Sequence, residues 1–435
     1  MTSLLGRIKH DAATHDTATQ DAALERIASA TKDLEPPFAA VDSVALDFNA
    51  SQLITRSNAL PVRVASKSVR SRAILGRVLG RDRVTETTAG SNTAAGQGFQ
   101  GIMAYSTAEA LWLAGAGDQH GVDGAVDILM GYPSVDTTSL AAITRDPVLS
   151  SRITLMADDV AHLDIIRAAA GSDRLAPRIC IDVDASLRIG PAHIGVRRSP
   201  LREPAQVAEL ARIAHARGFH VVGVMFYEAQ IAGLPDSNRA VELMKRLSAS
   251  ELLVRRQAVV SAVTDVVGPL EIVNGGGTGS LEVTSADPVV TEVTAGSGLF
   301  LPALFDRYKA FPPNPALYFA LPVLRKPTAS IATAFGGGYI ASGPVSATRV
   351  PLPVGFSNVV RGVTRGGLKL IRNEGAGEVQ TPLRNAESVA IGDRIWFRHA
   401  KAGEVCERFD TLYVIDADGG RSAVPTYRGE SKNFG

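Results

Sequence analysis

The chain has 435 residues, of which 45% are hydrophobic and 20% charged, so it can bury the core of one barrel with an attachment or of two or three domains. Its 45 basic and 44 acidic residues give a net charge of +1, which excludes a general attraction to nucleic acid or to acidic membranes. The two cysteines, Cys180 and Cys406, exclude a disulfide framework and favour a reducing compartment.

Targeting and membrane signals are the next features that the sequence lacks. The N-terminal stretch "MTSLLGRIKHDAATHDTATQ" has no long apolar core and does not resemble a secretory signal. No run reaches the roughly 18 apolar residues that a membrane helix needs. We therefore expect a soluble, cytoplasmic protein that binds neither nucleic acid nor membranes.

In chain order, a helix is predicted over residues 21–32, and a regular alternation of short apolar runs and amphipathic stretches follows it. Two of the amphipathic stretches begin with acidic residues and close on Gly171 and Gly218, as helix ends prefer. Apolar strands that alternate with helices indicate a parallel sheet covered by helices. The predicted strands are 61–66, 101–106, 126–132, 152–157, 178–184, 220–228, 270–277 and 291–298.

Eight such units predict a (β/α)8 TIM barrel, whose active site lies at the C-terminal ends of the strands. An open, doubly wound sheet is the alternative fold. Beyond about Arg307 the pattern changes to a proline-rich stretch and then to short strand candidates in "LKLIRNEG", "DRIWFRHAK" and "TLYVIDADGGRS". We therefore expect a helical segment at 1–35, the barrel at 36–310 and a smaller C-terminal β domain at 311–435.

Lys67 is the first candidate for chemistry, because it ends the first predicted barrel strand. A lysine partly desolvated at a strand end can form a Schiff base with a carbonyl cofactor. The alternative is an ordinary solvated lysine at the start of a helix, among Arg63, Arg70 and Arg72. The spacing alone leaves both interpretations open.

Two glycine-rich segments follow the last two predicted strands. "VNGGGTGS" contains Asn274, consecutive glycines, Thr278 and Ser280, and "TAGSG" covers residues 294–298. Consecutive glycines let backbone N–H groups approach an anion, and the hydroxyl groups add donors. Tight turns explain either segment alone, but barrels often bind phosphate after strands seven and eight. A phosphate site is therefore predicted here.

Other candidates lie after the fifth and sixth strands and in the C-terminal domain. Arg188 can reach a cofactor ring or form a loop ion pair, and Tyr227, before Glu228, can pack beside a flat ligand or simply in the core. His399 follows an apolar strand and can ligate metal, transfer protons or belong to a structural network. The neighbours of His399 in sequence are Lys401, Glu404 and Cys406.

Taken together, these features resemble the fold-type III pyridoxal-phosphate enzymes. Within that group the chain resembles the D-threonine aldolase and D-serine dehydratase family, often labelled amino-acid deaminase/aldolase and similar to the alanine racemase N-terminal domain. The resemblance covers nearly the whole chain. Its most specific segments are "RVASKSVRS", "VNGGGTGS" and "GEVQTPL…RHAKAGEVCERF".

The resemblance implies roles for particular residues. Lys67 would carry pyridoxal 5'-phosphate as a Schiff base, and Arg188 would match the arginine that faces the pyridine nitrogen, a position for which Arg197 competes. An arginine there disfavours protonation of the nitrogen and weakens the ring as an electron sink. Tyr227 and Asn274 would line the cofactor site. The phosphate would be held by Gly276, Gly277, Thr278, Gly296 and Ser297.

One departure from the family concerns metal. The metal-dependent members carry a histidine followed two residues later by cysteine or aspartate, whereas this chain has His399-Ala400-Lys401. A charged lysine is a poor ligand and repels a divalent ion, so a metal site is doubtful, with His399 as its one possible ligand. We hypothesise that the Lys401 ammonium replaces the metal and polarises a substrate β-hydroxyl, which makes Lys67, His399 and Lys401 the predicted catalytic residues.

The implied activity is that of a lyase acting on a small D-amino acid or β-hydroxy-α-amino acid, by aldol cleavage or by dehydration and deamination. An amino-acid racemase is the nearest alternative and needs a second acid/base group, which the sequence does not identify. A non-catalytic pyridoxal-phosphate-binding protein is the second alternative. Because fold-type III sites are usually completed across a dimer, a homodimer is expected.

Overall fold

The computed structural model describes residues 17–80, 98–115, 122, 127–171, 175–236, 238–310, 314–343, 346, 349–354, 367–401 and 403–435. The chain divides into two compact units. We call Ala50–Gly296 with Asn433–Gly435 the barrel unit, and Met1–Asn49 with Ser297–Lys432 the sheet unit. Each unit is described by itself.

The barrel unit contains a closed barrel of eight strands, all pairing in parallel. The strands follow chain order around the barrel, and the last strand pairs with the first through Val293 and Val62. Each of the eight predicted strands forms one of them, so the TIM-barrel prediction is confirmed and the open sheet is wrong. The strands are β2 (Val62–Ala65), β3 (Phe99–Ala104), β4 (Ile128–Pro133), β5 (Ile153–Ala157), β6 (Arg178–Asp182), β9 (His220–Phe226), β10 (Ile272–Gly275) and β11 (Glu292–Ala295).

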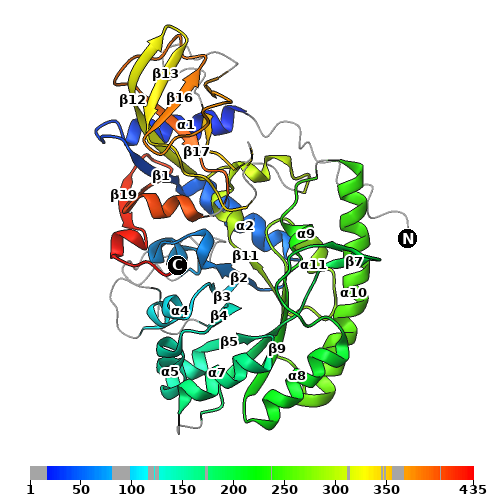
Figure 1. Cartoon of the computed structure of the whole chain (residues 1–435). Coiled ribbons are helices and arrows are strands. Elements are labelled where there is room, and N and C mark those ends of the chain that lie inside the picture. The colour runs from blue at the N-terminus through cyan, green and yellow to red at the C-terminus, as the bar shows by residue number, and fades with distance from the viewer. Residues whose placement is uncertain are drawn as a thin grey trace. The chain divides into compact units, whose positions relative to one another are not determined.

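Helices surround these strands (Figure 1). Side-chain caps explain several helix starts: Asp159 accepts a hydrogen bond from the Ala161 amide, and Glu203 and Gln206 form a capping box. The helices are α2 (Ser43–Arg56, which begins in the sheet unit), α3 (Arg72–Val78), α4 (Thr107–Ala114), α5 (Thr137–Arg145), α6 (Pro147–Arg152), α7 (Val160–Ala170), α8 (Pro204–Ala216), α9 (Ala229–Ala232), α10 (Arg239–Val267) and α11 (Leu281–Thr284). A short antiparallel hairpin, β7 (Leu187–Ile189) and β8 (Ala192–Ile194), interrupts the alternation after β6.

A charged cluster fills the N-terminal end of the barrel. Arg63, fully buried on β2, donates from Nε to Glu292 Oε1 and from Nη2 to Asp127 Oδ2, each at 2.7 Å. Both carboxylates lie at the starts of their strands, Glu292 in β11 and Asp127 just before β4. The two carboxylates compensate the charge that burial of the guanidinium would otherwise leave unpaired. The charged residues at the N-terminal end therefore stabilise the barrel. In barrels of this kind the active site lies at the opposite, C-terminal end.

The sheet unit is built on a nine-stranded sheet with the path β15-β16-β13-β12-β1-β18-β19, and β17 pairs with β12 and β14. Leu24 and Ile27 of α1 (Thr17–Ala30) pack into its core beside Phe38, Tyr318 and Trp396. A separate β-rich unit is thus confirmed. Its strands are β1 (Phe38–Asp42), β12 (Leu317–Thr328), β13 (Ile331–Phe335), β14 (Leu352–Val354), β15 (Lys369–Leu370), β16 (Gln380–Arg384), β17 (Arg394–Arg398), β18 (Thr411–Ile415) and β19 (Arg421–Pro425).

The division between the units differs from the expected boundaries at 35/36 and 310/311. Strand β1, expected within the barrel segment, lies between β12 and β18 of the sheet unit. The units meet in the chain at Asn49/Ala50 and at Gly296/Ser297. Because all five residues of β1 are buried, its sequence carries no alternation that would tell one sheet from the other.

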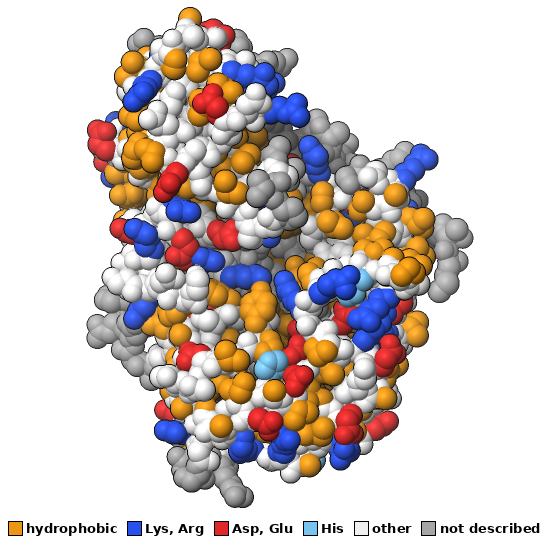
Figure 2. Space-filling model, viewed as in Figure 1, with side chains coloured by type: hydrophobic (Ala, Val, Ile, Leu, Met, Phe, Trp, Pro, Cys, Tyr) orange, Lys and Arg blue, Asp and Glu red, His pale blue; other side chains and the backbone are white. Residues whose placement is uncertain are grey.

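Two general features of the described residues bear on binding partners. None of their helices is long and apolar enough to cross a membrane. Figure 2 shows basic and acidic side chains interspersed over the face in view.

Candidate active site

Lys67 lies at the C-terminal end of the first barrel strand. It belongs to a single 3-10 turn, η1 (Ser66–Ser68), that directly follows β2. The Val69 amide donates to the Ser66 carbonyl at 2.8 Å and the Ser66 hydroxyl donates to the Met103 carbonyl of β3 at 3.1 Å, so the turn is tied to the neighbouring strand. Lys67 is thus the second residue after the strand, at the C-terminal end of the barrel, which we call its mouth.

Lys67 forms a close pair with Tyr132. The two atoms Lys67 Nζ and Tyr132 Oη are 2.6 Å apart, and Tyr132 lies near the C-terminal end of β4. Burial raises the pKa of the Tyr132 phenol, but the Lys67 ammonium and the Arg198 guanidinium lower it by more, so the net shift is downward. A lysine and a phenol that share a hydrogen bond in this way can exchange a proton.

Arg198 extends this pair across the mouth. Its guanidinium lies 5.6 Å from the ring centroid of Tyr132 and 5.0 Å from that of Tyr227, which follows β9. Both distances are within the range of a cation–π contact. The side chains of Lys67, Tyr132, Arg198 and Tyr227 thus form one continuous series of contacts, which brings two of the predicted residues together through two that were not predicted.

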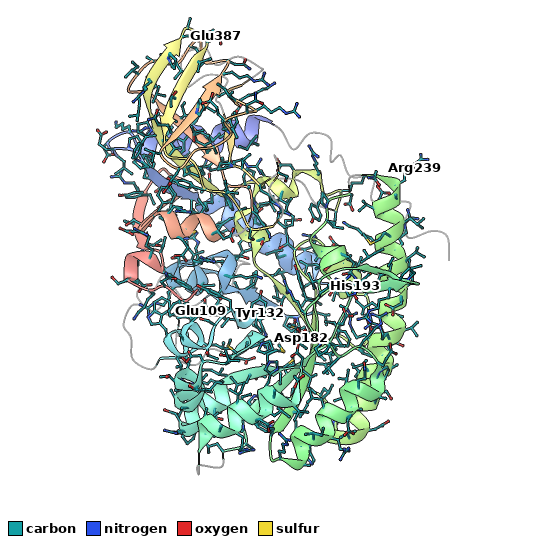
Figure 3. All side chains as sticks on the ribbon, in the orientation of Figure 1. Glu109, Tyr132, Asp182, His193, Arg239 and Glu387 are labelled. Carbon is teal, nitrogen blue, oxygen red and sulfur yellow. The ribbon has the colours of Figure 1, made fainter. Side chains whose placement is uncertain are left out.

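Asp182 ends β6 within the barrel unit, and Figure 3 labels it together with Tyr132. It is 7% exposed, and burial, followed by the nearby Asp158 carboxylate, raises its pKa to about 7, against the opposing effect of Arg198. A carboxyl group with this pKa gains or loses its proton near neutral pH. It is therefore a titratable group that the sequence analysis missed.

The first glycine segment is held by a buried carboxylate. Glu228, 1% exposed, accepts from the Gly276 amide at 3.0 Å, and the hydroxyl groups of Ser280 and Thr284 also donate to it. The Gly277 amide donates to Ser280 Oγ at 3.2 Å. Gly276 has φ of +86°, which favours glycine. The amides expected to hold a phosphate are thus engaged inside the protein.

Close packing explains two of the other glycines. A Cβ on Gly277 would lie 2.9 Å from Ala232 Cβ and 3.6 Å from Tyr227 Cε2, which places this loop beside the Tyr227 ring. A Cβ on Gly296 would lie 2.6 Å from the Ala65 carbonyl oxygen and 2.9 Å from Ser68 Cβ, on either side of Lys67 in the chain. Both predicted glycine positions therefore border the Lys67 mouth.

Asn274 and Thr278 are both buried, with different surroundings. Asn274 Nδ2 donates to Glu292 Oε1 at 2.7 Å and to Thr294 Oγ1 at 2.8 Å, inside the barrel. The Thr278 carbonyl accepts from Arg56 Nη2 at 2.6 Å.

Arg188 is placed in the β7–β8 hairpin, where its Nη2 lies 2.7 Å from Asp184 Oδ2. Its side chain is 46% exposed. Although burial raises the pKa of the Asp184 carboxyl, hydrogen bonds from Ser186 and the Arg188 charge lower it on balance. The arginine that contacts the Tyr132 and Tyr227 rings is Arg198, next to Arg197 in the chain.

The remaining predicted residues, Ser297, His399 and Lys401, belong to the sheet unit. His399 is 2% exposed and neither ring nitrogen has a hydrogen-bond partner among the described residues. Burial and then the Arg398 charge lower the pKa of His399 to about 3, so its ring is neutral at ordinary pH. Lys401 Nζ donates to Ser342 Oγ at 3.0 Å, and Ser297 is the first residue of α12 (Ser297–Phe300).

The described residues do not form a donor set for a metal ion. Over the described ranges from residue 17 to 435, no three His, Cys, Asp or Glu side chains gather in a way that can hold a metal ion. Cys406, near His399 in sequence, and Cys180 are both buried, and no disulfide joins them. We therefore derive no chemical step through a metal.

Neither a family model nor a curated protein matches the sequence. Among solved structures, D-threonine aldolase from Filomicrobium marinum is similar at 18% identity with a TM-score of 0.69, covering 91% of this chain and 96% of that chain. This chain has the fold of the fold-type III pyridoxal-phosphate enzymes.

Two further structures agree with that fold. D-threo-3-hydroxyaspartate dehydratase from Delftia sp. HT23 matches at 19% identity and a TM-score of 0.65, covering 90% of this chain and 97% of that chain. Alanine racemase from Clostridium difficile 630, in complex with cycloserine, matches at 11% identity and a TM-score of 0.57, covering 90% and 99%. The resemblance in fold is therefore confirmed, and it extends over nearly the whole chain.

Sequence reasoning missed Tyr132, Arg198 and Asp182. Tyr132 and Asp182 occupy the ends of strands that the sequence did predict, so the rule that barrel sites lie at strand ends was a usable signal for both. Arg198 lies in "GVRRSPL", beyond a hairpin, and no periodicity distinguishes it from Arg197. Only the folded loop shows which of the two arginines meets the tyrosine rings.

Proposed function

We propose that this protein is a pyridoxal-phosphate-dependent lyase that acts on a small D-amino acid or a β-hydroxy-α-amino acid. The observation that carries the proposal is the Lys67–Tyr132 pair at the C-terminal mouth of a fold-type III barrel. The three similar structures are an aldolase, a dehydratase and a racemase. Each name refers to an amino-acid substrate, which supports the substrate class proposed here.

The residues at the mouth fit this cofactor in several respects. Lys67 offers a primary amine for a covalent bond to an aldehyde, and Tyr227 and Arg198 offer an aromatic face and a positive charge beside it. The Gly276 and Gly277 amides already bond to Glu228 and Ser280, so a phosphate bound by these amides has to displace those acceptors. When bound, the cofactor supplies an electron sink for negative charge at the substrate Cα.

The chain's own residues then handle protons and charge. Lys67 Nζ and Tyr132 Oη hold and exchange protons at the mouth, because they share one hydrogen bond. Arg198 stabilises negative charge on the phenol oxygen of Tyr132. Arg188 is paired with Asp184 on the β7–β8 hairpin. To contact the cofactor ring, as proposed from the sequence, Arg188 requires a movement of this hairpin toward the barrel mouth.

The first test is the absorbance spectrum of the purified protein with added pyridoxal 5'-phosphate, before and after borohydride reduction. We expect reduction to fix the cofactor on Lys67, as peptide mapping would show. Lys67→Ala should abolish the attachment. Lys245→Ala, which removes an α10 lysine paired with Asp236, should leave it unchanged. Attachment that persists without Lys67 would contradict the proposal.

The second test separates the reactions. A panel of D-amino and β-hydroxy amino acids should yield an aldehyde with glycine for an aldolase, or a keto acid with ammonia for a dehydratase. Tyr132 also favours a racemase as a second candidate, because it supplies an acid/base group that the sequence did not identify. Loss of optical rotation without either product would favour that activity.

The third test concerns the sheet unit and the cofactor-carrier alternative. Substitution of His399 should leave cofactor binding intact in both an enzyme and a carrier, and it should abolish turnover if the protein is an enzyme.

A further experiment concerns Lys401. The Lys401→Ala variant, measured together with the content of bound metal, tests whether the ammonium polarises a substrate hydroxyl. Stoichiometric bound metal would contradict that role. Light scattering tests the proposed homodimer.

A further inference from the structure

We propose that Tyr132 is the proton acceptor that activates Lys67 for attack on a carbonyl group. The proposal rests on the proposed function of Lys67, and it adds a catalytic residue that no motif in the sequence indicated. Its main observation is geometric: the phenol oxygen lies 2.6 Å from the amine nitrogen that would react. A side chain within hydrogen-bond reach of the reacting atom meets the first requirement of a general base.

The charged groups around Tyr132 support this role. Lys67 approaches from η1, and Arg198 places its guanidinium 5.6 Å from the ring centroid. Both cations stabilise a phenolate. Asp182, at the end of β6, opposes them when it is ionised. The two cations outweigh this carboxyl group and the burial of the ring, so the phenol ionises more readily than an ordinary tyrosine.

Tyr227 provides an internal comparison. Its ring also lies against Arg198, at 5.0 Å, but among the described residues it forms neither a hydrogen bond nor a ring contact with Lys67. Of the two tyrosines that share this arginine, only Tyr132 combines the cation with a direct bond to the amine. The inference is therefore specific to Tyr132.

The proposed step is the attack of the Lys67 amine on a carbonyl carbon, with loss of water. The Lys67 ammonium transfers one proton to the Tyr132 phenolate, which leaves a neutral amine and a neutral phenol. The amine lone pair attacks the carbonyl carbon, and the carbonyl π electrons move to its oxygen. The phenol returns its proton to that oxygen, which departs as water with a second proton from the nitrogen when the C=N bond forms. No oxidant or reductant is needed.

The first experiment needs no cofactor. Tyrosinate absorbance of the apoprotein is followed against pH for the wild type, Tyr132→Phe and Lys67→Met. We expect one of the eight tyrosines to ionise below the others in the wild type, and this step to be absent from Tyr132→Phe. In Lys67→Met it should move to higher pH, because one of its two stabilising cations is gone. Three superimposable curves would overturn the proposal.

The second experiment measures the rate of C=N bond formation with pyridoxal 5'-phosphate over a range of pH. Tyr132→Phe should be slower by about 100-fold near neutral pH, the lower range for general base catalysis, and should approach the wild type at alkaline pH, where hydroxide can serve as the base in place of the phenolate. Tyr413→Phe, which removes a hydroxyl in the sheet unit, is the matched control. The pH-dependent convergence is a result that mere loss of packing would not produce.

The outcomes distinguish this proposal from the proposed function. If the wild type forms no C=N bond at Lys67, the proposed function fails and this step fails with it. If the wild type and Tyr132→Phe react at the same rate at every pH, only the role of Tyr132 is overturned. If Tyr132→Phe is unstable, the titration of Lys67→Met decides whether the phenol and the amine share a proton.

Discussion

The two units of this protein differ in how they arrange the residues that suggest chemistry. In the barrel unit, Lys67, Tyr132, Arg198 and Tyr227 touch one another in series around the strand ends. In the sheet unit, the buried His399 ring meets Phe300 edge to face, neither of its nitrogens is hydrogen-bonded to a described residue, and Lys401 bonds to Ser342. The barrel unit thus contains an arrangement that can move a proton as it stands, whereas the sheet unit offers separate groups.

Burial has opposite electrostatic consequences in the two units. It raises the pKa of Asp182 in the barrel unit to about 7 and lowers the pKa of His399 in the sheet unit to about 3. Both shifts favour the neutral form, because a charge is poorly solvated in either place. Asp182 and His399 should therefore make the free energy of unfolding change with pH in opposite directions in the two units. Substitution of each residue tests this difference.

The largest expected effect is a loss of stability of the barrel unit when Arg63 is replaced. Arg63→Met leaves Glu292 buried without its cation, and loss of one partner of a buried ion pair typically costs about 3–5 kcal/mol. Chemical denaturation measures the free energy of unfolding. Arg212→Met, which removes an exposed helical ion pair with Glu209, is the control and should have little effect. Equal effects of the two variants would contradict the structural role assigned to the Arg63 cluster.

The second prediction concerns the acid stability of the sheet unit. The pKa of His399 is about 3 when folded and about 6.5 when unfolded, so the unfolded chain takes up the proton first as the pH falls. The stability due to the neutral ring is therefore present above about pH 6.5 and lost as the pH falls toward 3. The loss is at most about 1.4 kcal/mol per pH unit.

His399→Gln, which cannot be protonated, tests this dependence. Its free energy of unfolding should fall less steeply than that of the wild type over the same pH range. Two parallel profiles would show that the ring is not buried as a neutral group.

The third prediction is that Asp182 makes the stability of the barrel unit decrease as the pH rises, opposite to the effect of His399 in the sheet unit. Because the pKa of Asp182 is about 7 when folded and about 3.8 when unfolded, the unfolded chain releases the proton first as the pH rises. The stability due to the protonated carboxyl is present below about pH 3.8 and lost as the pH rises toward 7. The total change is on the order of 4 kcal/mol. Asp182→Asn should reduce this loss, as thermal unfolding at several pH values would reveal.

The smallest expected effect concerns Gly296, whose backbone lies beside Lys67 at the mouth of the barrel. In Gly296→Ala the added Cβ would lie 2.6 Å from the Ala65 carbonyl oxygen, so the backbone beside Lys67 has to shift. We expect a destabilisation of about 1–3 kcal/mol and weaker cofactor binding. Gly115→Ala, whose nearest neighbour would be 3.3 Å away, is the control. If the cofactor binds equally well to both variants, the Gly296 backbone is not part of the site.

Most of the barrel could be predicted because its signal is local. Each strand is a short apolar run, and each helix carries its own start and stop residues, so eight repeats were enough to indicate closure. No strand was predicted at Phe38–Asp42, and the expected boundaries placed these residues in the barrel segment, because the partners of β1, Leu317–Ala320 and Leu412–Ile415, are remote in sequence. A fully buried strand gives no sign of which remote strand it will join.

The candidate site was less accessible to sequence reasoning. Lys67 and the glycine segments could be proposed as site residues because strand ends and glycine runs can be recognised in the sequence. The Lys67–Tyr132 contact joins residues on β2 and β4, and the choice of Arg198 over Arg197 depends on a loop conformation. The engagement of Gly276 by Glu228 was also not foreseeable, since a glycine run shows that amides are accessible but not what they bond to.

The position of β1 has a consequence for how the protein is made. Phe38–Asp42 pairs with β12 and β18, and its register with β18 begins at Leu412. At a synthesis rate of about 5–20 residues per second, this apolar segment emerges tens of seconds before its last partner exists. During that interval the barrel strands can already assemble, whereas β1 stays an unpaired apolar segment, and such segments are prone to aggregate. Slowed translation should therefore reduce the yield of this chain through β1 rather than through the barrel.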